Sequence, residues 1–279
     1  MELLMDGVAE FIAVVARQRS SSTALSMAIA HHPCVAWGNE LFHVTGAARL
    51  RRACGTQDRF AARLLRTHGK GALHAARFSH PIAYLRAVRD LQLSTRWPKR
   101  SGHLCSRASY ALVFKLFDKH VHGRLGEGGL RELLAHPRVA VVVLERDAGG
   151  AECSLEWARS ASDWGMRPER HHSREYAAFR TAHCAGRMPT PEYRVAHDAW
   201  YGCVRTLLRS ANKPFLEVSF NESTHELVHV LRRVYTLARL WTDQWSPHLD
   251  VTEANVARFR DPVYNETCTL PPNRLFSGR

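Results

Sequence analysis

The segment "FIAVVARQRSSSTALSMAIAHHP", residues 11–33, is the most informative stretch of this sequence. An apolar run ends at a basic segment, four hydroxyl side chains follow, and the pattern then becomes helical. A strand that turns directly into a helix leaves free amide groups at the positive end of the helix dipole. Such a turn lies at the carboxyl edge of a parallel sheet, where open α/β folds bind ligands. The stretch therefore predicts a first βα unit with an anion site at its turn.

Short apolar runs recur along the rest of the chain, with helical patterns between them. The run "VAVVVL" is unbroken and β-branched, as expected of a parallel strand covered on both faces. Strands that alternate with helices indicate βαβ units, so we expect an α/β fold: three layers around a mostly parallel central sheet. The five expected strands are residues 11–16, 34–37, 111–116, 139–144 and 215–220.

The length of 279 residues is enough for one large α/β domain with a sizeable core. Residues 46–107 carry helical patterns and no clear strand, so we expect a helical insertion there within a single domain spanning 1–279. No apolar run approaches the roughly 20 residues that a membrane span requires. The apolar fraction of 45% and mean hydropathy of −0.29 are typical of a soluble globular protein.

The net charge of +13, from 39 basic and 26 acidic residues, favours an anionic partner. Nucleic acid, a membrane surface and a phosphorylated or sulfated small molecule all fit that description. Much of the excess lies between residues 49 and 107, where a solvated arginine-rich helical face explains it equally well.

Seven cysteines form no CxxC pair and make an odd count. This pattern resembles reduced, individually placed thiols more than a disulfide framework. We therefore expect a cytoplasmic protein, or one of the Golgi lumen if an anchor lies outside this sequence.

The turn at residues 19–23 concentrates anion-binding groups. Arg19 adds a fixed positive charge, and Ser20, Ser21, Ser22 and Thr23 add hydroxyl donors beside the free amides. A plain helix N-cap at Ser22 or Thr23 explains one hydroxyl but not four behind an arginine. We interpret the turn as a phosphate cradle. No glycine occurs between residues 7 and 38, so it is not a Walker loop and nucleoside triphosphate hydrolysis is not expected.

Two segments carry a family resemblance. "RQRSSSTALS" (17–26) resembles the 5′-phosphosulfate loop of sulfotransferases that use 3′-phosphoadenosine 5′-phosphosulfate (PAPS). "VAVVVLERDAGGAECSLEWARSASDW" (139–164) resembles the 3′-phosphate site of the same superfamily, with Arg146 at a strand end and Ser154 eight residues later. A surface ion pair of Arg146 with Asp147 or Glu152 is the alternative reading of the second segment.

Three further stretches are similar to the same superfamily, nearest its tyrosylprotein and bacterial trehalose-type branches. These stretches are "HHPCVAWGNELF" (31–42), "SYALVFKLFD" (109–118) and "KPFLEVSFNESTHELVHVL" (213–231).

The sequence also departs from the pattern of the superfamily. Ser21 replaces the usual glycine of the 5′-phosphosulfate loop, and "FNES" replaces a YEDL-like strand end. The RKGxxGDW loop of the cytosolic phenol branch is absent.

The resemblance implies a P-loop-like sulfotransferase fold and a transferase that moves a sulfuryl group from PAPS to a hydroxyl or amine acceptor. Adenosine 3′,5′-bisphosphate would leave, and no metal, nucleic acid or membrane span is expected. Arg19 would stabilise the leaving group and Glu40 would act as general base, with His43 as the second choice. A structural or solvent-exposed carboxylate is the alternative role for Glu40. The expected donor-binding residues are Arg19, Ser20, Ser21, Ser22, Thr23, Ala24, Arg146 and Ser154.

Two other functions compete with this one. Residues 225–229 read HELVH, the HExxH pattern of zinc peptidases, although an amphipathic helix explains the same letters. A basic nucleic-acid-binding protein fits the charge, but no recognisable reader motif supports it. We expect the histidine pairs His120/His122 and His171/His172 to lie at the surface, because neither has metal-ligand partners at suitable spacing.

Overall fold

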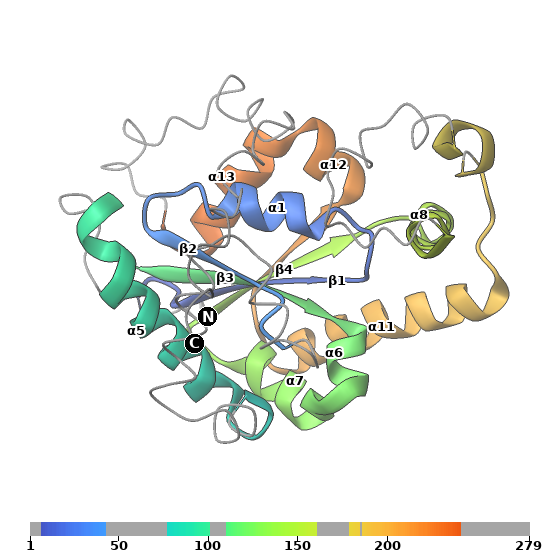
Figure 1. Cartoon of the computed structure of the whole chain (residues 1–279). Coiled ribbons are helices and arrows are strands. Elements are labelled where there is room, and N and C mark those ends of the chain that lie inside the picture. Colours follow the sequence, from blue (N-terminus) through green and yellow to red (C-terminus); the bar gives the residue numbers. More distant parts are fainter. Residues whose placement is uncertain (1–6, 43–76, 101–109, 161–178, 185, 241–279) are drawn as a thin grey trace, which may run out of the picture.

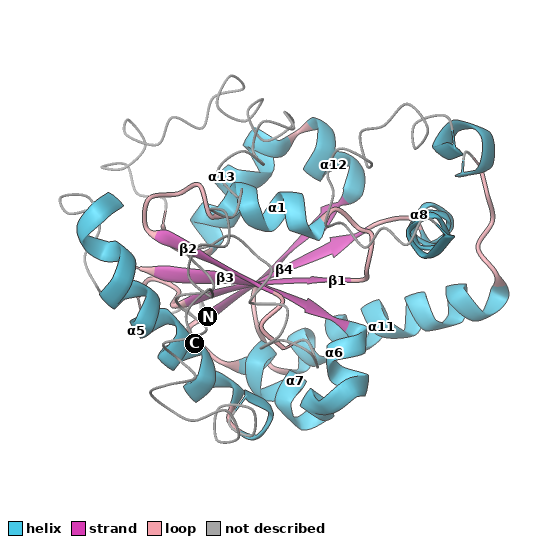
Figure 2. Ribbon diagram, viewed as in Figure 1, coloured by secondary structure: helices cyan, strands magenta, loops and turns pink. Residues whose placement is uncertain are grey.

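The computed structural model describes residues 7–42, 77–100, 110–160, 179–184 and 186–240. Its centre is a five-stranded sheet with the order β2-β3-β1-β4-β5, in which all four pairings are parallel (Figures 1 and 2). The expected α/β class is therefore confirmed, and each expected strand is present to within two residues. The strands are β1 (Phe11–Ala16), β2 (Val35–Asn39), β3 (Ala111–Phe117), β4 (Val139–Glu145) and β5 (Phe215–Ser219).

Strand β1 lies in the middle of the sheet. It pairs with β3 on one side and β4 on the other, and all six of its residues are buried. Both faces of these central strands are covered by helices, which explains why their sequences are apolar without alternation. The end of β1 consequently places the turn at residues 17–21 in the middle of the carboxyl edge.

Helices cover both faces, which gives three layers. Helices α1 (Ser22–Ile29) and α13 (Leu227–Leu237) pack on the face that carries Ile12 and Val14. Helices α5 (Pro81–Arg100), α7 (Gly126–Ala135) and α11 (Pro191–Ser210) pack on the opposite face (Figure 1). The even residues of β1 therefore face one helical layer and the odd residues the other.

Helix α5 makes up most of the described part, residues 77–100, of the segment expected as an insertion. Its residues Ile82, Leu85 and Val88 are buried in the same cluster as the core residues of β1 and β3. Because two adjacent parallel strands require a crossover connection, α5 belongs to the connection between β2 and β3. The rest of 46–107, namely 46–76 and 101–107, lies outside the described residues. That the chain is a single domain stays a prediction.

The remaining elements lie beyond strand ends. Helix α8 lies at the carboxyl side of β4, at the right of Figure 1. The full set of remaining elements is α6 (Asp118–His120), the π-helical turn η2 (Val121–Leu125), α8 (Ala148–Ser160), the π-helical turn η3 (Arg180–Cys184) and α12 (Phe220–His225).

Within the described ranges, no helix is long and apolar enough to cross a membrane.

Cys153 in α8 and Cys184 in η3 form a disulfide. The expectation of reduced thiols is therefore wrong for this pair, and it is wrong for Cys34 as well, which is also disulfide-bonded. The residues are 31 positions apart, and sequence spacing alone does not reveal which cysteines a fold brings together. Cys203 on α11 is a free, exposed thiol.

Candidate functional site

The turn between β1 and α1 has an unusual backbone. Arg19 and Ser21 both adopt left-handed conformations, with φ of 68° and 63°. Ser20 lies between them and is not left-handed. Alternation of hand along a short segment turns successive amides toward one side, which is the geometry of an anion-binding nest. Ser21 therefore takes the conformation for which a glycine is the usual residue.

The hydroxyl groups of the turn are not used for a plain helix cap. Ser21 is the N-cap of α1, and its side chain makes no capping hydrogen bond. The Ser20 hydroxyl donates to the carbonyl of Arg17 at 2.7 Å, which closes the turn. The alternative to a cradle, a plain N-cap at Ser22 or Thr23, is wrong because Ser21 holds the N-cap position. The amides of the first turn of α1 have no acceptor within the helix.

The two predicted phosphate motifs meet in space. Arg19 Nε donates to Ser154 Oγ at 3.2 Å, and Arg146 Nη1 donates to the backbone carbonyl of Arg19 at 2.9 Å. Ser154 and Arg146 are both buried, at 3% and 8% exposure. Two distant segments of the sequence thus contribute three residues to one cluster beside the turn.

The Arg146 guanidinium stacks on an aromatic ring but does not use all of its hydrogen-bond donors. It lies over the Phe220 ring at 4.3 Å, and its Nε has no hydrogen-bond partner among the described residues. Asp147 Oδ1 lies 4.0 Å from that Nε, at the outer limit of an ion pair. Glu152, the other proposed ion-pair partner, instead accepts hydrogen bonds from Thr190. The arrangement leaves a buried guanidinium donor available for an anion.

A second cluster surrounds Glu40, just after β2. Lys115 Nζ lies 3.4 Å from Glu40 Oε1, and Lys119 Nζ lies 3.5 Å from Oε2. His120 Nε2 lies 3.8 Å from Oε2. Lys115 also donates to Thr23 Oγ1 at 2.8 Å, so this cluster adjoins the start of α1.

Charge controls the protonation of this cluster. Burial raises the pKa of the Glu40 carboxyl, but the His120 ring and the charges of Lys115 and Lys119 outweigh burial and hold that pKa well below its usual range. Burial lowers the pKa of His120. Glu40 is therefore a stable anion; 22% of its side chain is exposed, and its Oε2 atom is buried.

Apart from Glu40, the residues of this cluster were not predicted from the sequence. The signal was Lys115, a lysine inside the apolar strand "ALVFKLF", which is buried with 2% exposure. The expectation that His120 lies at the surface is wrong: its side chain is fully buried, and Nδ1 accepts a hydrogen bond from the Phe117 amide. His122 is exposed as expected, whereas His43, His171 and His172 lie outside the described residues.

The HELVH segment does not form one helical face. Helix α12 ends at His225, Glu226 has φ −121° and ψ 32°, and α13 begins at Leu227. The apolar face of α13 is buried, as the amphipathic-helix interpretation requires. Within the described ranges, no group of three His, Cys, Asp or Glu side chains could hold a metal ion.

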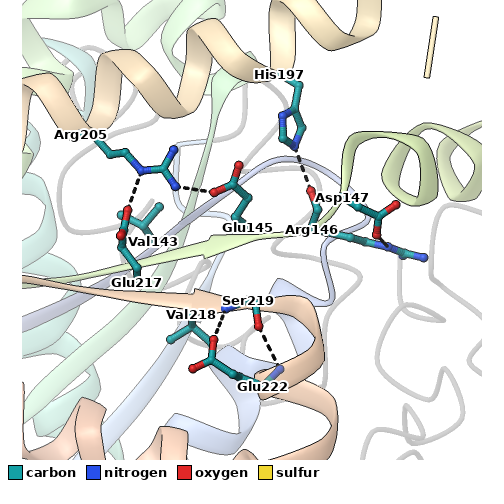
Figure 3. Close-up of a pocket in the computed structure, with 10 residues that line it drawn as sticks. All are labelled: Val143, Glu145, Arg146, Asp147, His197, Arg205, Glu217, Val218, Ser219 and Glu222. Carbon is teal, nitrogen blue, oxygen red and sulfur yellow. Dashed lines mark hydrogen bonds and ion pairs between the residues drawn. The ribbon is translucent and has the colours of Figure 1, made fainter. Parts of the chain in front are cut away.

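A cavity of about 410 Å³ lies beyond the carboxyl ends of β4 and β5 (Figure 3). Arg205 reaches into it from α11 and forms ion pairs with Glu145 and Glu217. His197, also on α11, contacts the Arg146 carbonyl at 2.9 Å. The residues that line it are Val143, Glu145, Arg146, Asp147, His197, Arg205, Glu217, Val218, Ser219 and Glu222.

Comparison with known proteins identifies no family for this chain. No family model matches it, and no curated protein sequence matches it. Among solved structures it is similar to the sulfotransferase domain of the olefin synthase from Synechococcus PCC 7002, at 12% identity. That alignment covers 93% of this chain and 90% of the other, with a TM-score of 0.34. A TM-score of this size carries no inference about the chain, so function has to be argued from its own residues.

Proposed function

We propose that this chain is a PAPS-dependent sulfotransferase with a P-loop-like fold. It would move a sulfuryl group from PAPS to a hydroxyl or amine acceptor and release adenosine 3′,5′-bisphosphate. The observation that carries the proposal is the cluster of Arg19, Arg146 and Ser154, because one short cluster then offers donors to both phosphates of the nucleotide.

In this proposal the 5′-phosphosulfate lies in the turn before α1. The amides of Ser20 to Ala24 and the hydroxyl groups of the turn would hold it, supported by the left-handed backbone at Arg19 and Ser21. Arg146 and Ser154 would hold the 3′-phosphate. The Arg146 Nε, which has no hydrogen-bond partner within the described part of the chain, supports this assignment, since a planar guanidinium can donate two parallel hydrogen bonds to a phosphate. The cavity beside Arg146 offers space for the nucleoside.

The reaction would be an in-line displacement at sulfur. The acceptor oxygen or nitrogen forms a bond to sulfur while the bond from sulfur to the bridging phosphate oxygen breaks. Negative charge builds up on that bridging oxygen, and Arg19 and Lys115 are placed to stabilise it. The acceptor proton passes to a base, for which we propose the Glu40 carboxylate, with His43 as the second choice. Its low pKa makes Glu40 a weak base, so it suits a proton that becomes acidic as the new bond forms.

The competing functions have less support. A zinc peptidase requires His225 and His229 on one helical face, and the break at Glu226 separates them. A nucleic-acid-binding protein would account for the net charge of +13, but not for the buried arginine and serine beside the turn.

The location of the protein is a separate proposal. The Cys153–Cys184 disulfide favours an oxidising compartment, because disulfides are rare in the cytosol. Of the two locations expected from the sequence, the lumen therefore agrees better with the structure than the cytoplasm.

A transfer assay tests the function. Purified protein would be incubated with PAPS carrying a radiolabelled sulfuryl group and with carbohydrate, peptide and small-molecule acceptors in turn. We expect label to appear in one class of acceptor and to be lost from that product with R19A. Transfer that persists with R19A, or stoichiometric zinc together with peptide hydrolysis, would contradict the proposal.

A further inference from the structure

Helix α8 carries Ser154 but has few contacts with the sheet. Its contacts with other elements are chiefly with η3 and α11 (Figure 1). The position of Ser154 therefore depends on what holds α8 against the segment that runs from η3 to α11.

One face of α8 is attached to that segment at residues 149, 152, 153 and 156, which are spaced as i, i+3, i+4 and i+7. Gly149 lies so close to the Arg187 carbonyl that a side chain there would overlap it. Glu152 accepts hydrogen bonds from the Thr190 amide and hydroxyl at 2.8 and 2.6 Å. Glu156 forms a two-point ion pair with Arg187 at 2.5 and 2.8 Å.

The disulfide is the covalent member of this set. Cys153 is fully buried and lies between Glu152 and Ser154, and its partner Cys184 belongs to η3. The Glu156–Arg187 pair is partly exposed, at 41% and 32%, and pairs of that kind contribute little to stability. The disulfide is therefore the one covalent contact of this set, and its loss would leave α8 held by the Glu152–Thr190 hydrogen bonds and the exposed ion pair.

Residues 153 and 154 point in different directions from the same turn of helix. Cys153 links to η3, while the Ser154 hydroxyl accepts the Arg19 hydrogen bond at 3.2 Å. We propose that the Cys153–Cys184 disulfide positions Ser154 for the 3′-phosphate, so that breaking it reduces 3′-phosphate recognition and leaves the 5′-phosphate cradle intact. This inference rests on the proposed function.

Because the disulfide positions Ser154, the affinity for the donor should depend on redox conditions. A dithiol such as dithiothreitol would supply two electrons and two protons, convert the disulfide to two thiols and become oxidised to its own cyclic disulfide. The turn before α1 contains no cysteine and starts from β1, so it does not depend on this bond.

The test compares two nucleotides by calorimetric titration. Adenosine 3′,5′-bisphosphate reports on both phosphate sites, and adenosine 5′-monophosphate reports on the cradle alone. For C153A/C184A we expect binding of the bisphosphate to weaken about tenfold, the effect of losing one charged hydrogen bond, with the monophosphate changed less than twofold. C203A removes an exposed thiol and is the matched control, expected to behave like wild type.

A double-mutant cycle separates positioning from general loosening. If the disulfide acts through Ser154, S154A should cost about tenfold in wild type and less than twofold in C153A/C184A. Equal weakening of both nucleotides in C153A/C184A, or full additivity with S154A, would overturn the inference.

Two further measurements keep the test decisive if C153A/C184A folds poorly. Peptide mapping without reductant should find Cys153 linked to Cys184, and wild-type protein in dithiothreitol should lose discrimination as the double variant does. Absence of that link, or unchanged discrimination between the two nucleotides after its reduction, would overturn this inference but not the proposed function. Wild-type protein that never distinguishes the two nucleotides would instead contradict the proposed function.

Discussion

Arg146 donates a 2.9 Å hydrogen bond to the backbone carbonyl of Arg19, although 127 residues separate the two positions in the sequence. The bond joins the end of β4 to the turn after β1, two adjacent parallel strands whose carboxyl ends lie at the same edge. It therefore fixes the distance between the two groups that we propose hold the two phosphates of PAPS.

Replacement of Arg146 tests the 3′-phosphate assignment. We expect R146A to weaken binding of adenosine 3′,5′-bisphosphate by about 100-fold, because a two-point charged contact is lost. Binding of adenosine 5′-monophosphate should weaken less, through the lost contact with the Arg19 carbonyl. R131A, which removes an exposed arginine paired with Glu127, is the control and should bind both nucleotides normally. A uniform loss for both nucleotides with R146A would show that Arg146 acts only as a structural residue.

Substitution of Ser21 tests the left-handed turn. A non-glycine residue at positive φ raises the free energy of the folded state by about 1–2 kcal/mol. Glycine removes this strain but also increases the entropy of the unfolded chain, which offsets part of the gain. We expect S21G to be as stable as wild type or slightly more so and to bind the bisphosphate normally. S21V should lower the melting temperature and weaken binding, because a β-branched residue tolerates this conformation poorly. If S21V and S21G melted and bound alike, Ser21 would not hold the left-handed conformation in solution.

Replacement of Glu40 tests the base. E40Q keeps the shape of the side chain but removes its charge and its ability to accept a proton. We expect binding of the bisphosphate within a few-fold of wild type and turnover reduced about 10²–10⁴-fold, the usual contribution of a positioned acid or base. A fully active E40Q with a good acceptor would refute the assignment and direct attention to His43.

The ion cluster around Glu40 also predicts a pH dependence of stability. Its folded-state pKa lies below the ordinary value of 4.5, so the unfolded state binds the proton more readily. The contribution of ionised Glu40 to the stability of the folded state is complete above that ordinary pKa and is lost as pH falls toward the lower folded-state pKa. Urea denaturation between about pH 5 and pH 3 should therefore show a smaller loss of stability for E40Q than for wild type. E127Q changes an exposed carboxyl and should follow wild type; equal slopes for E40Q and wild type would contradict the cluster.

The sequence predicted the sheet well because buried parallel strands are apolar runs of limited length. β1 matches its expected boundaries of residues 11–16, and β4 extends only one residue beyond the expected run. The convergence of Arg19, Arg146 and Ser154 agrees with the sequence expectation, since Arg19 and Arg146 follow the ends of β1 and β4 on the same edge and Ser154 lies in α8, the helix that follows β4.

What the sequence did not predict depends on contacts between distant segments. Lys115 points from β3 toward Glu40 and Thr23, and only the order of the strands brings these together. His120 lies in α6 directly after β3, where its ring contacts Phe117 and lies beside Glu40, and this burial is not indicated by histidine spacing. The pairing of Cys153 with Cys184 likewise arises from the packing of α8 against η3.

The most direct test of the central claim is calorimetric titration of the wild-type protein with adenosine 3′,5′-bisphosphate and, separately, with adenosine 5′-monophosphate. We expect micromolar binding of the bisphosphate and binding at least tenfold weaker without the 3′-phosphate, because Arg146 and Ser154 would then lack their ligand. Equal affinity for the two nucleotides, or binding of neither, would contradict the assignment of this chain as a PAPS-dependent sulfotransferase.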